Sequence, residues 1–374
     1  PVHPFMLTVD EIHKTGATVN TITLSPLSEA ELNLLVADTL NCESSLAQPL
    51  TKLVYQKTQG NPFFATQFLK ALHDDQLISF YPPQSPLGKG GSQGGWQCDI
   101  AKVKSLAITD DVVEFMALQL QKLPRETQDV LKLAACIGAQ FDLNTLVIVS
   151  EQSAAMTATA LWKVMQEGLV IPTSKIYKFF TESESDEVVK ASANPTYRFL
   201  HDRVQQAAYS LIIDSQKKAT HLKIGQLLQQ NCSKIEQEEK LFDMIGHLNR
   251  GIELISQPSE REALAQLNLK AGSKARSSTA YAAARIYLQT GIELLTANCW
   301  QSQHELTLNL YVAATEAAYL NADFDGMEQL AERVLQKART ILDKVKIYEI
   351  QIAALTAQSQ MLEAIAVARD ALLQ

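Results

Sequence analysis

The sequence has no long hydrophobic run and no paired cysteines. In 374 residues, its apolar stretches are interrupted well short of the roughly 18 to 20 residues that cross a bilayer. The five cysteines lie far apart and form no CxxC pair, so the pattern indicates neither a disulfide framework nor a zinc site. We therefore expect a cytoplasmic protein that does not contact membranes.

Basic side chains are fewer than acidic ones. The chain has 33 basic and 41 acidic side chains, for a net charge of -8, so the molecule as a whole repels phosphate backbones. The 46% apolar content is ordinary for a globular protein and excludes wholesale disorder. We expect no nucleic-acid partner.

Glycine and proline are unevenly distributed. Five of the 15 glycines fall within residues 88–95, directly after three prolines, and this composition predicts a low-complexity insertion or linker over residues 82–96. No proline follows Pro258, and only three glycines do. The last third of the chain is therefore expected to be almost entirely helical.

The segment before the glycine-rich stretch predicts three helices. Ser28 and Glu31 have the spacing of a capping box, which opens a helix that continues to Leu40. Apolar spacing predicts a second helix over residues 46–57 and a third that begins near Pro62. A β-branched alternation over residues 19–24 predicts a strand ahead of them.

A different module is expected after the glycine-rich stretch. Helical spacing and short β-branched runs predict helices over residues 124–137, 144–150 and 157–166, strands over 169–171 and 196–200, and a further helix over 202–213. Three helices closed by a β-hairpin are typical of a winged helix. Between residues 124 and 213 there are 8 basic and 10 acidic residues, which disfavours DNA binding by this module.

The C-terminal part repeats itself. The pattern Tyr281-x-x-Ala284-x-x-Tyr287 recurs from Phe324 and again from Met361, at intervals of 43 and 37 residues. This period is typical of stacked helix-turn-helix repeats similar to tetratricopeptide units. The sequence therefore predicts a mostly α-helical fold that ends in an α-solenoid.

Some short motifs match catalytic patterns without their context. Residues 90–94 fit G-x-S-x-G, but no strand enters and no helix leaves that stretch. Gly88-Lys89 lacks the glycine and the hydroxyl residue that a phosphate loop requires, and Phe5–Asp10 resembles a magnesium-binding strand only in its apolar run and final acid. We assign no catalytic residue and no metal site to the chain.

Two other motifs have a structural and a functional interpretation. Gly60-Asn61-Pro62 fits a helix start, with Asn61 as its cap, and it equally fits an edge that packs the proline ring on a flat heterocycle. His201 precedes a predicted helix that Asp202 could cap. At such a helix start an imidazole can also donate a hydrogen bond to a phosphate.

Taken together, these features resemble the STAND-type signalling ATPases, and in particular the ATPase module of cyanobacterial multi-domain kinases. The likeness rests on the lid motif Gly60-Asn61-Pro62-Phe63-Phe64, on LPRETQDVLKLAACIGAQFD, and on FLHDRVQQAAYSL, which contains His201. Such proteins have a Ser/Thr kinase domain before this module and histidine-kinase domains after it.

The resemblance implies a nucleotide-gated switch. It gives residues 1–27 as the end of an NTPase core, 28–81 as a helical lid, 97–214 as the winged-helix domain and 215–374 as sensor repeats. By the same resemblance, His201 contacts the β-phosphate of ADP, and Gly60, Asn61 and Pro62 contact adenine. The repeats would bind a protein or peptide, and the other partners would be the NTPase core and the kinase domains.

The sequence departs from this family because it has no phosphate loop and no magnesium-binding acid. Since the first residue is Pro1, we expect a piece of a longer polypeptide, in which ATP or ADP binds only when the whole is present. This chain alone is expected neither to hydrolyse ATP nor to hold it tightly. Two alternatives stay open: a protein-interaction scaffold without a nucleotide switch, and a transcription regulator of similar architecture.

Overall fold

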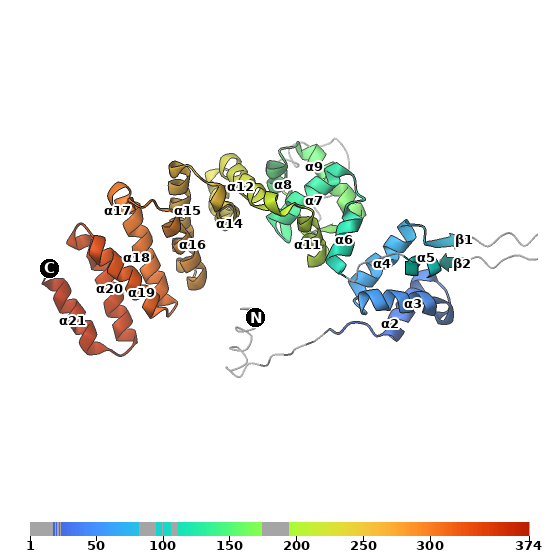
Figure 1. Ribbon diagram of the computed structural model, residues 1–374, viewed down its shortest axis with the longest axis horizontal. Coiled ribbons are helices and arrows are strands. Elements are labelled where there is room, and N and C mark those ends of the chain that lie inside the picture. Colours follow the sequence, from blue (N-terminus) through green and yellow to red (C-terminus); the bar gives the residue numbers. More distant parts are fainter. Residues whose placement is uncertain are drawn as a thin grey trace, which may run out of the picture. The chain divides into compact units, whose positions relative to one another are not determined.

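The computed structural model describes residues 18, 20, 22, 24–81, 95–98, 100–105, 111–173 and 194–373. This part is mostly helical, as the sequence predicts (Figure 1). The chain divides into two compact units, the first ending at Lys122 and the second starting at Leu123.

The first unit begins with three helices that lie close to their predicted positions. They are α2 (Glu29–Leu40), α3 (Ser44–Thr58) and α4 (Pro62–Asp74). The expected capping box is present: the Ser28 hydroxyl accepts the Glu31 N–H, and the Glu31 carboxylate accepts the Ser28 N–H. Leu32, Val36 and Val54 are fully buried between these helices and form part of the core of this unit.

The rest of the first unit was not foreseen from the sequence. It consists of the antiparallel strands β1 (Ile78–Tyr81) and β2 (Gly95–Cys98) and the helices α5 (Ile100–Ser105) and α6 (Val112–Leu120). The Phe115 ring of α6 lies 5.3 Å from Phe64 and 5.7 Å from Phe68, centroid to centroid. The described residues between 95 and 122 therefore belong to the first unit, whereas we expected the linker to reach residue 96 and the next domain to start at 97.

The entry to α4 is fixed by a close backbone contact. The Leu27 N–H donates to the Gly60 carbonyl at 2.8 Å, which joins the segment before α2 to the turn before α4. Gly60 is buried and has a φ of +74°, and a Cβ at this position would lie 2.0 Å from the Leu27 carbonyl oxygen. Only glycine fits there, because both the backbone conformation and the available space exclude a side chain.

The second unit opens with a winged helix. Its elements are α7 (Arg125–Ile137), β3 (Gln140–Asp142), α8 (Leu143–Ser150), α9 (Ala154–Gln166), β4 (Val170–Pro172) and β5 (Thr196–Phe199). The strands form an antiparallel sheet in the order β3-β5-β4. Leu131, Leu146 and Leu161, one from each helix, are at most 1% exposed in its core. The sequence predicted the helices and the hairpin but missed β3, which has only three residues.

Helices fill the rest of the second unit. They are α11 (Asp202–Ser210), α12 (Asp214–Asn231), α13 (Lys234–Glu239), α14 (Leu241–Arg250), the short 3-10 helix η2 (Ile252–Leu254), α15 (Pro258–Ser277), α16 (Tyr281–Leu294), α17 (Cys299–Ser302), α18 (His304–Leu320), α19 (Phe324–Lys337), α20 (Ile341–Ala357) and α21 (Met361–Leu372). Helices α15 and α16, α18 and α19, and α20 and α21 pack as successive pairs (Figure 1).

The repeated sequence pattern marks the second helix of each pair. Ala284, Met327 and Ala364 hold the same place in the three copies, at the starts of α16, α19 and α21, and all three are buried. Small residues let the paired helices approach closely, since Gly272 of α15 leaves no room for a Cβ beside the Leu288 side chain of α16. The solenoid predicted from the repeats is the observed arrangement.

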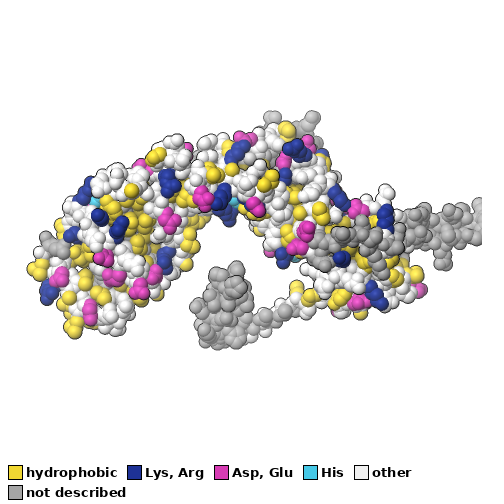
Figure 2. All heavy atoms as spheres, viewed as in Figure 1, with side chains coloured by type: hydrophobic (Ala, Val, Ile, Leu, Met, Phe, Trp, Pro, Cys, Tyr) yellow, Lys and Arg dark blue, Asp and Glu magenta, His cyan; other side chains and the backbone are white. Residues whose placement is uncertain are grey.

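Several predictions concern residues outside the described ranges. They include Phe5–Asp10, Gly88-Lys89 and the serine motif over 90–94. Of the strand expected over 19–24, the described residues 20, 22 and 24 belong to no strand. Among the described helices, none is long and apolar enough to cross a bilayer. On the face drawn in Figure 2, basic and acidic side chains are interspersed over the repeats.

The Gly60 contact gives a first prediction. Gly60→Ala should destabilise the first unit by about 3 kcal/mol or more, because backbone strain adds to overpacking against Leu27. Hydrogen exchange of the α2, α3 and α4 amides would measure the loss. The matched control is Gly168→Ala in the second unit, which has a similar φ of +69° but nothing within 4 Å of a new Cβ. It should cost only about 1 to 2 kcal/mol. Unchanged exchange in Gly60→Ala would show that this interpretation is wrong.

Candidate functional site

The motif Gly60-Asn61-Pro62 forms the start of α4. The Asn61 side-chain oxygen accepts the Phe64 N–H at 3.0 Å, and Pro62 occupies the first helical turn, where its missing N–H costs nothing. Phe64 turns into the core, while Asn61 and Pro62 are exposed. The motif therefore builds a helix start and also presents a rigid ring at the surface.

An apolar cavity of about 330 Å³ lies elsewhere in the same unit. It lies among α2, α4 and the β-hairpin, and its lining includes Leu35, Leu69, Ile78 and Trp96. Gly60, Asn61 and Pro62 do not line it. The proline ring is thus presented outside this cavity, at the N-terminus of α4.

His201 is the N-cap of α11. Its Nδ1 accepts the Arg203 backbone N–H at 3.1 Å. The structural interpretation of the sequence, in which Asp202 caps this helix, is therefore wrong, because Asp202 is the first helical residue. Because Nδ1 serves as an acceptor, the proton of the neutral ring resides on Nε2. The backbone therefore fixes the tautomer in which Nε2 is a donor.

The four predicted site residues fall into two groups. Gly60, Asn61 and Pro62 lie together in the first unit, at one helix start, and His201 lies in the second unit, at another. Each group is placed by a capping hydrogen bond that a backbone amide donates to a side chain.

A buried polar chain that the sequence analysis missed links α11 to the repeats. The Tyr209 hydroxyl of α11 lies 3.0 Å from His221 Nε2 of α12, and His221 Nδ1 lies 2.8 Å from His247 Nδ1 of α14. Both histidines are at most 3% exposed. Their spacing along the sequence carried no motif, so only the packing of α11, α12 and α14 reveals the chain.

This geometry requires at least one of the two imidazoles to be neutral, and burial favours the neutral form of both. Two nitrogens 2.8 Å apart share one proton, so one ring donates and the other accepts. Burial and, to a smaller extent, the nearby Arg250 charge together lower the pKa of His221 to about 4. Burial likewise lowers the pKa of His247 to about 4, with additional effects of His221 and Arg250.

A second contact fastens the winged helix to the repeats. Asp142 caps α8 by accepting the Thr145 N–H at 2.8 Å, and the Lys240 ammonium lies 3.2 Å from the same carboxylate. Burial alone would raise the pKa of Asp142, but hydrogen bonds from Thr145 and Asn194 and the Lys240 charge outweigh it and lower this pKa. This contact therefore joins the winged helix to the first repeat helices in addition to the chain through Tyr209.

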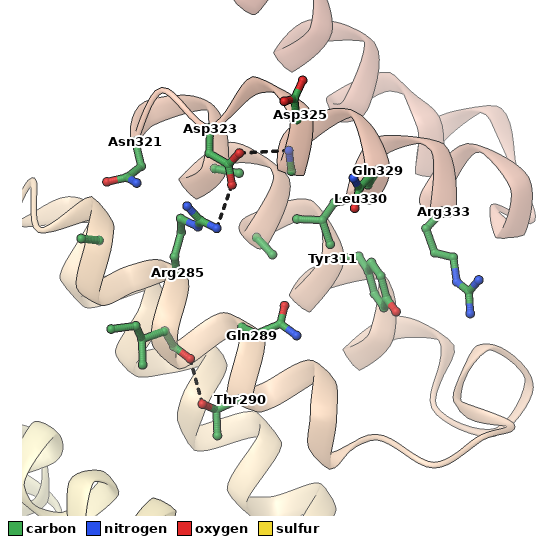
Figure 3. A pocket seen from close by; sticks show the side chains of 15 residues that line it. Arg285, Gln289, Thr290, Tyr311, Asn321, Asp323, Asp325, Gln329, Leu330 and Arg333 are labelled. Carbon is green, nitrogen blue, oxygen red and sulfur yellow. Dashed lines mark hydrogen bonds and ion pairs between the residues drawn. The ribbon is translucent and has the colours of Figure 1, made fainter.

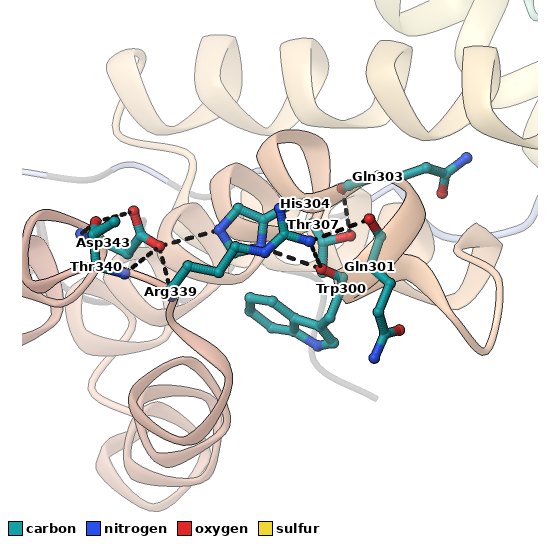
Figure 4. Close-up of polar contacts among 8 residues, drawn as sticks. All are labelled: Trp300, Gln301, Gln303, His304, Thr307, Arg339, Thr340 and Asp343. Atoms are coloured by element: carbon teal, nitrogen blue, oxygen red, sulfur yellow. Dashed lines mark hydrogen bonds and ion pairs between the residues drawn. The ribbon is translucent and has the colours of Figure 1, made fainter.

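Another polar cluster braces the later repeats (Figure 4). The Asp343 carboxylate accepts the Arg339 and Thr340 backbone amides and lies 3.1 Å from His304 Nε2. Burial would raise the pKa of Asp343, yet these hydrogen bonds lower it to about 2. The Arg339 guanidinium also donates to the Trp300 carbonyl at 2.8 Å. These groups satisfy one another, so the cluster is a structural joint between α18 and α20.

A protein named for signal transduction is similar to this chain over part of its length. No family model matches the sequence. The chain is similar to a segment of hybrid signal transduction histidine kinase G of Dictyostelium discoideum, at 29% identity over 360 residues, covering 85% of this chain and 10% of that protein. It thus spans about a tenth of the relative's length.

The neutral histidine pair gives a prediction on pH. Above about pH 6.5 both histidines are neutral whether the chain is folded or unfolded, so they add no pH dependence there. As the pH falls from 6.5 towards 4, only the unfolded chain gains protons, so each histidine lowers stability by up to about 1.4 kcal/mol per pH unit. His247→Gln should flatten this slope in urea titrations at several pH values.

The matched control is His73→Gln, because His73 is an exposed histidine in the first unit. The unfolding free energy of His73→Gln should depend on pH with the same slope as that of the unmodified chain. Equal slopes for His247→Gln and the unmodified chain would contradict the neutral pair.

Proposed function

We propose that this chain is the regulatory portion of a nucleotide-switched signal-transduction ATPase attached to protein kinase domains, comprising its lid, winged helix and sensor repeats. The observation that carries the proposal is the hydrogen bond from the Arg203 amide to His201 Nδ1, which makes Nε2 the donor nitrogen of the neutral ring. A donor held at a helix N-terminus suits a phosphate oxygen.

The surroundings of His201 favour an anion. The amides of the first turn of α11 and the helix dipole both provide partial positive charge, and Arg203 adds a full one. Asp202 in the same turn opposes this, so we assign to His201 one oriented contact rather than a whole phosphate site. The other phosphate contacts would come from the NTPase core of the same polypeptide.

The adenine end of the ligand is assigned to the start of α4. Pro62 presents an exposed ring that offers no competing donor, and the Asn61 cap and the Gly60–Leu27 contact hold that ring in place. Since these residues offer a single apolar surface, this chain alone should not hold ATP or ADP tightly. ADP would bind only in the full-length protein, where the NTPase core supplies the remaining contacts.

In this proposal the repeats are the input. A protein or peptide bound by the repeats would favour one of two arrangements of the winged helix, and thereby weaken or strengthen the His201 contact with ADP. The buried chain through Tyr209, His221 and His247 supports such coupling, because it connects α11 to α12 and α14. The output would be a change in the attached kinase.

A second candidate function is a protein-interaction scaffold without a nucleotide switch. It is favoured by a cavity of about 850 Å³ among α16, α18 and α19, which needs no nucleotide to form. In this case the winged helix would act only as a spacer. Nucleotide retention by the full-length protein distinguishes the two.

Substituting His201 tests the proposal, provided that its capping role is separated from its donor role. In the full-length protein, His201→Asn should keep the helix cap, because asparagine caps well, but should lose the Nε2 donor. We expect ADP to dissociate about tenfold faster, as for the loss of one hydrogen bond to a charged group. His201→Ala should speed dissociation similarly and also destabilise the second unit by about 1 kcal/mol.

Nucleotide release is measured with radiolabelled ADP, and stability by thermal unfolding. If His201→Asn retains ADP as long as the unmodified protein does, the phosphate contact is wrong. If the unmodified full-length protein retains no nucleotide, the nucleotide switch is wrong and the protein-interaction scaffold is the function that the structure favours.

A further inference from the structure

A groove runs across the middle of the solenoid (Figure 3). It has a volume of about 850 Å³, and its walls are α16 and α19. The floor is α18, where Ala314 and Ala318 are buried and too small to fill the space above them. The groove is thus a consequence of the same small residues that allow the helices to pack closely.

The walls carry polar side chains at intervals of one helical turn. On α19 these are Asp325, Gln329 and Arg333, and on α16 they are Arg285 and Gln289. Neighbours in each row are four positions apart in the sequence, so the rows follow the groove. From Asp325 to Arg333 the groove extends about 12 Å, the length of about four residues of extended chain.

The charges in the groove are only partly balanced. Arg285 is neutralised by Asp323, with nitrogen and oxygen 2.7 Å apart, and Figure 3 shows Arg333 extending away from that pair. Asp325 lies in the first turn of α19, where the helix dipole stabilises its charge. Arg333 makes no ion pair with any carboxylate in the described part of the chain, so a positive charge is left over at its end of the groove.

Other groups near Arg333 suit a polypeptide. The Gln329 amide makes no hydrogen bond to another described residue, and a primary amide both donates to and accepts from a peptide backbone. Tyr311 and Leu330 are half-buried and provide apolar surface beside it. A ligand that matches the amide, the apolar surface and the positive charge has a peptide backbone, an apolar side chain and a negative charge beside it.

We infer that this groove binds an extended peptide segment of a partner protein, with an acidic side chain of the peptide paired to Arg333 and its backbone bonded to Gln329. This identifies the chemistry of the input that the proposed function assigns to the repeats. Binding is measured on this chain without nucleotide, so a failure here leaves the nucleotide switch standing, and the reverse also holds.

Capped octapeptides test the inference. The probe is fluorescein-labelled Ala-Leu-Ala-Glu-Leu-Ala-Glu-Ala, blocked at both ends, and the comparison peptides carry Lys or Gln in place of Glu. Fluorescence anisotropy should show about tenfold tighter binding of the Glu peptide than of the Lys peptide. Arg333→Gln should reduce this preference to about twofold or less, because the remaining charges of the groove act on the peptide only over distances at which salt screens them.

The control is Arg369→Gln, which removes an exposed arginine from α21, outside the groove. Its preference should equal that of the unmodified chain. The side chain of Arg333 is exposed, so its loss should leave folding intact, which circular dichroism can verify. Equal binding of the three peptides, no binding, or an undiminished preference in Arg333→Gln would each overturn the inference.

Discussion

The hydrogen-bonded chain from Tyr209 through His221 to His247 is the contact on which the second unit depends. Its two imidazoles are buried and share one proton, so at least one of them is neutral. The same helix, α11, begins at the His201 cap and carries Tyr209 two turns later. A shift of the first repeat helices therefore acts directly on the helix whose N-terminus His201 completes.

The first unit depends on a comparable constraint of the backbone. The contact between Leu27 and Gly60 joins the chain before α2 to the turn before α4, and Asn61 then caps the helix that begins at Pro62. Both predicted site motifs are thus helix starts whose geometry is set by capping bonds. A residue that caps a helix can also contact a ligand, because the cap uses only one of its polar atoms.

The sequence predicted what depends on local signals and missed what depends on packing. The Ser28 capping box, the Asn61 cap and the pattern from Tyr281 all specify helices through near neighbours, and these predictions are confirmed. Strand β3 and the pairing of β1 with β2 depend on partners far along the chain, so no local pattern marked them. His221 and His247 are 26 residues apart and meet only when α12 packs on α14. The tautomer of His201 likewise required the position of the Arg203 amide.

In the proposed switch, a nucleotide that contacts His201 is coupled to the repeats through the buried histidines. Hydrogen exchange of the full-length protein, with and without ADP, tests it most directly. The account predicts that ADP slows exchange in α11 and also in α12 and α14, and that Tyr209→Phe, which removes one hydroxyl, abolishes the protection beyond α11. Protection in α12 and α14 that is unchanged by Tyr209→Phe, or that is absent from the unmodified protein, would contradict it.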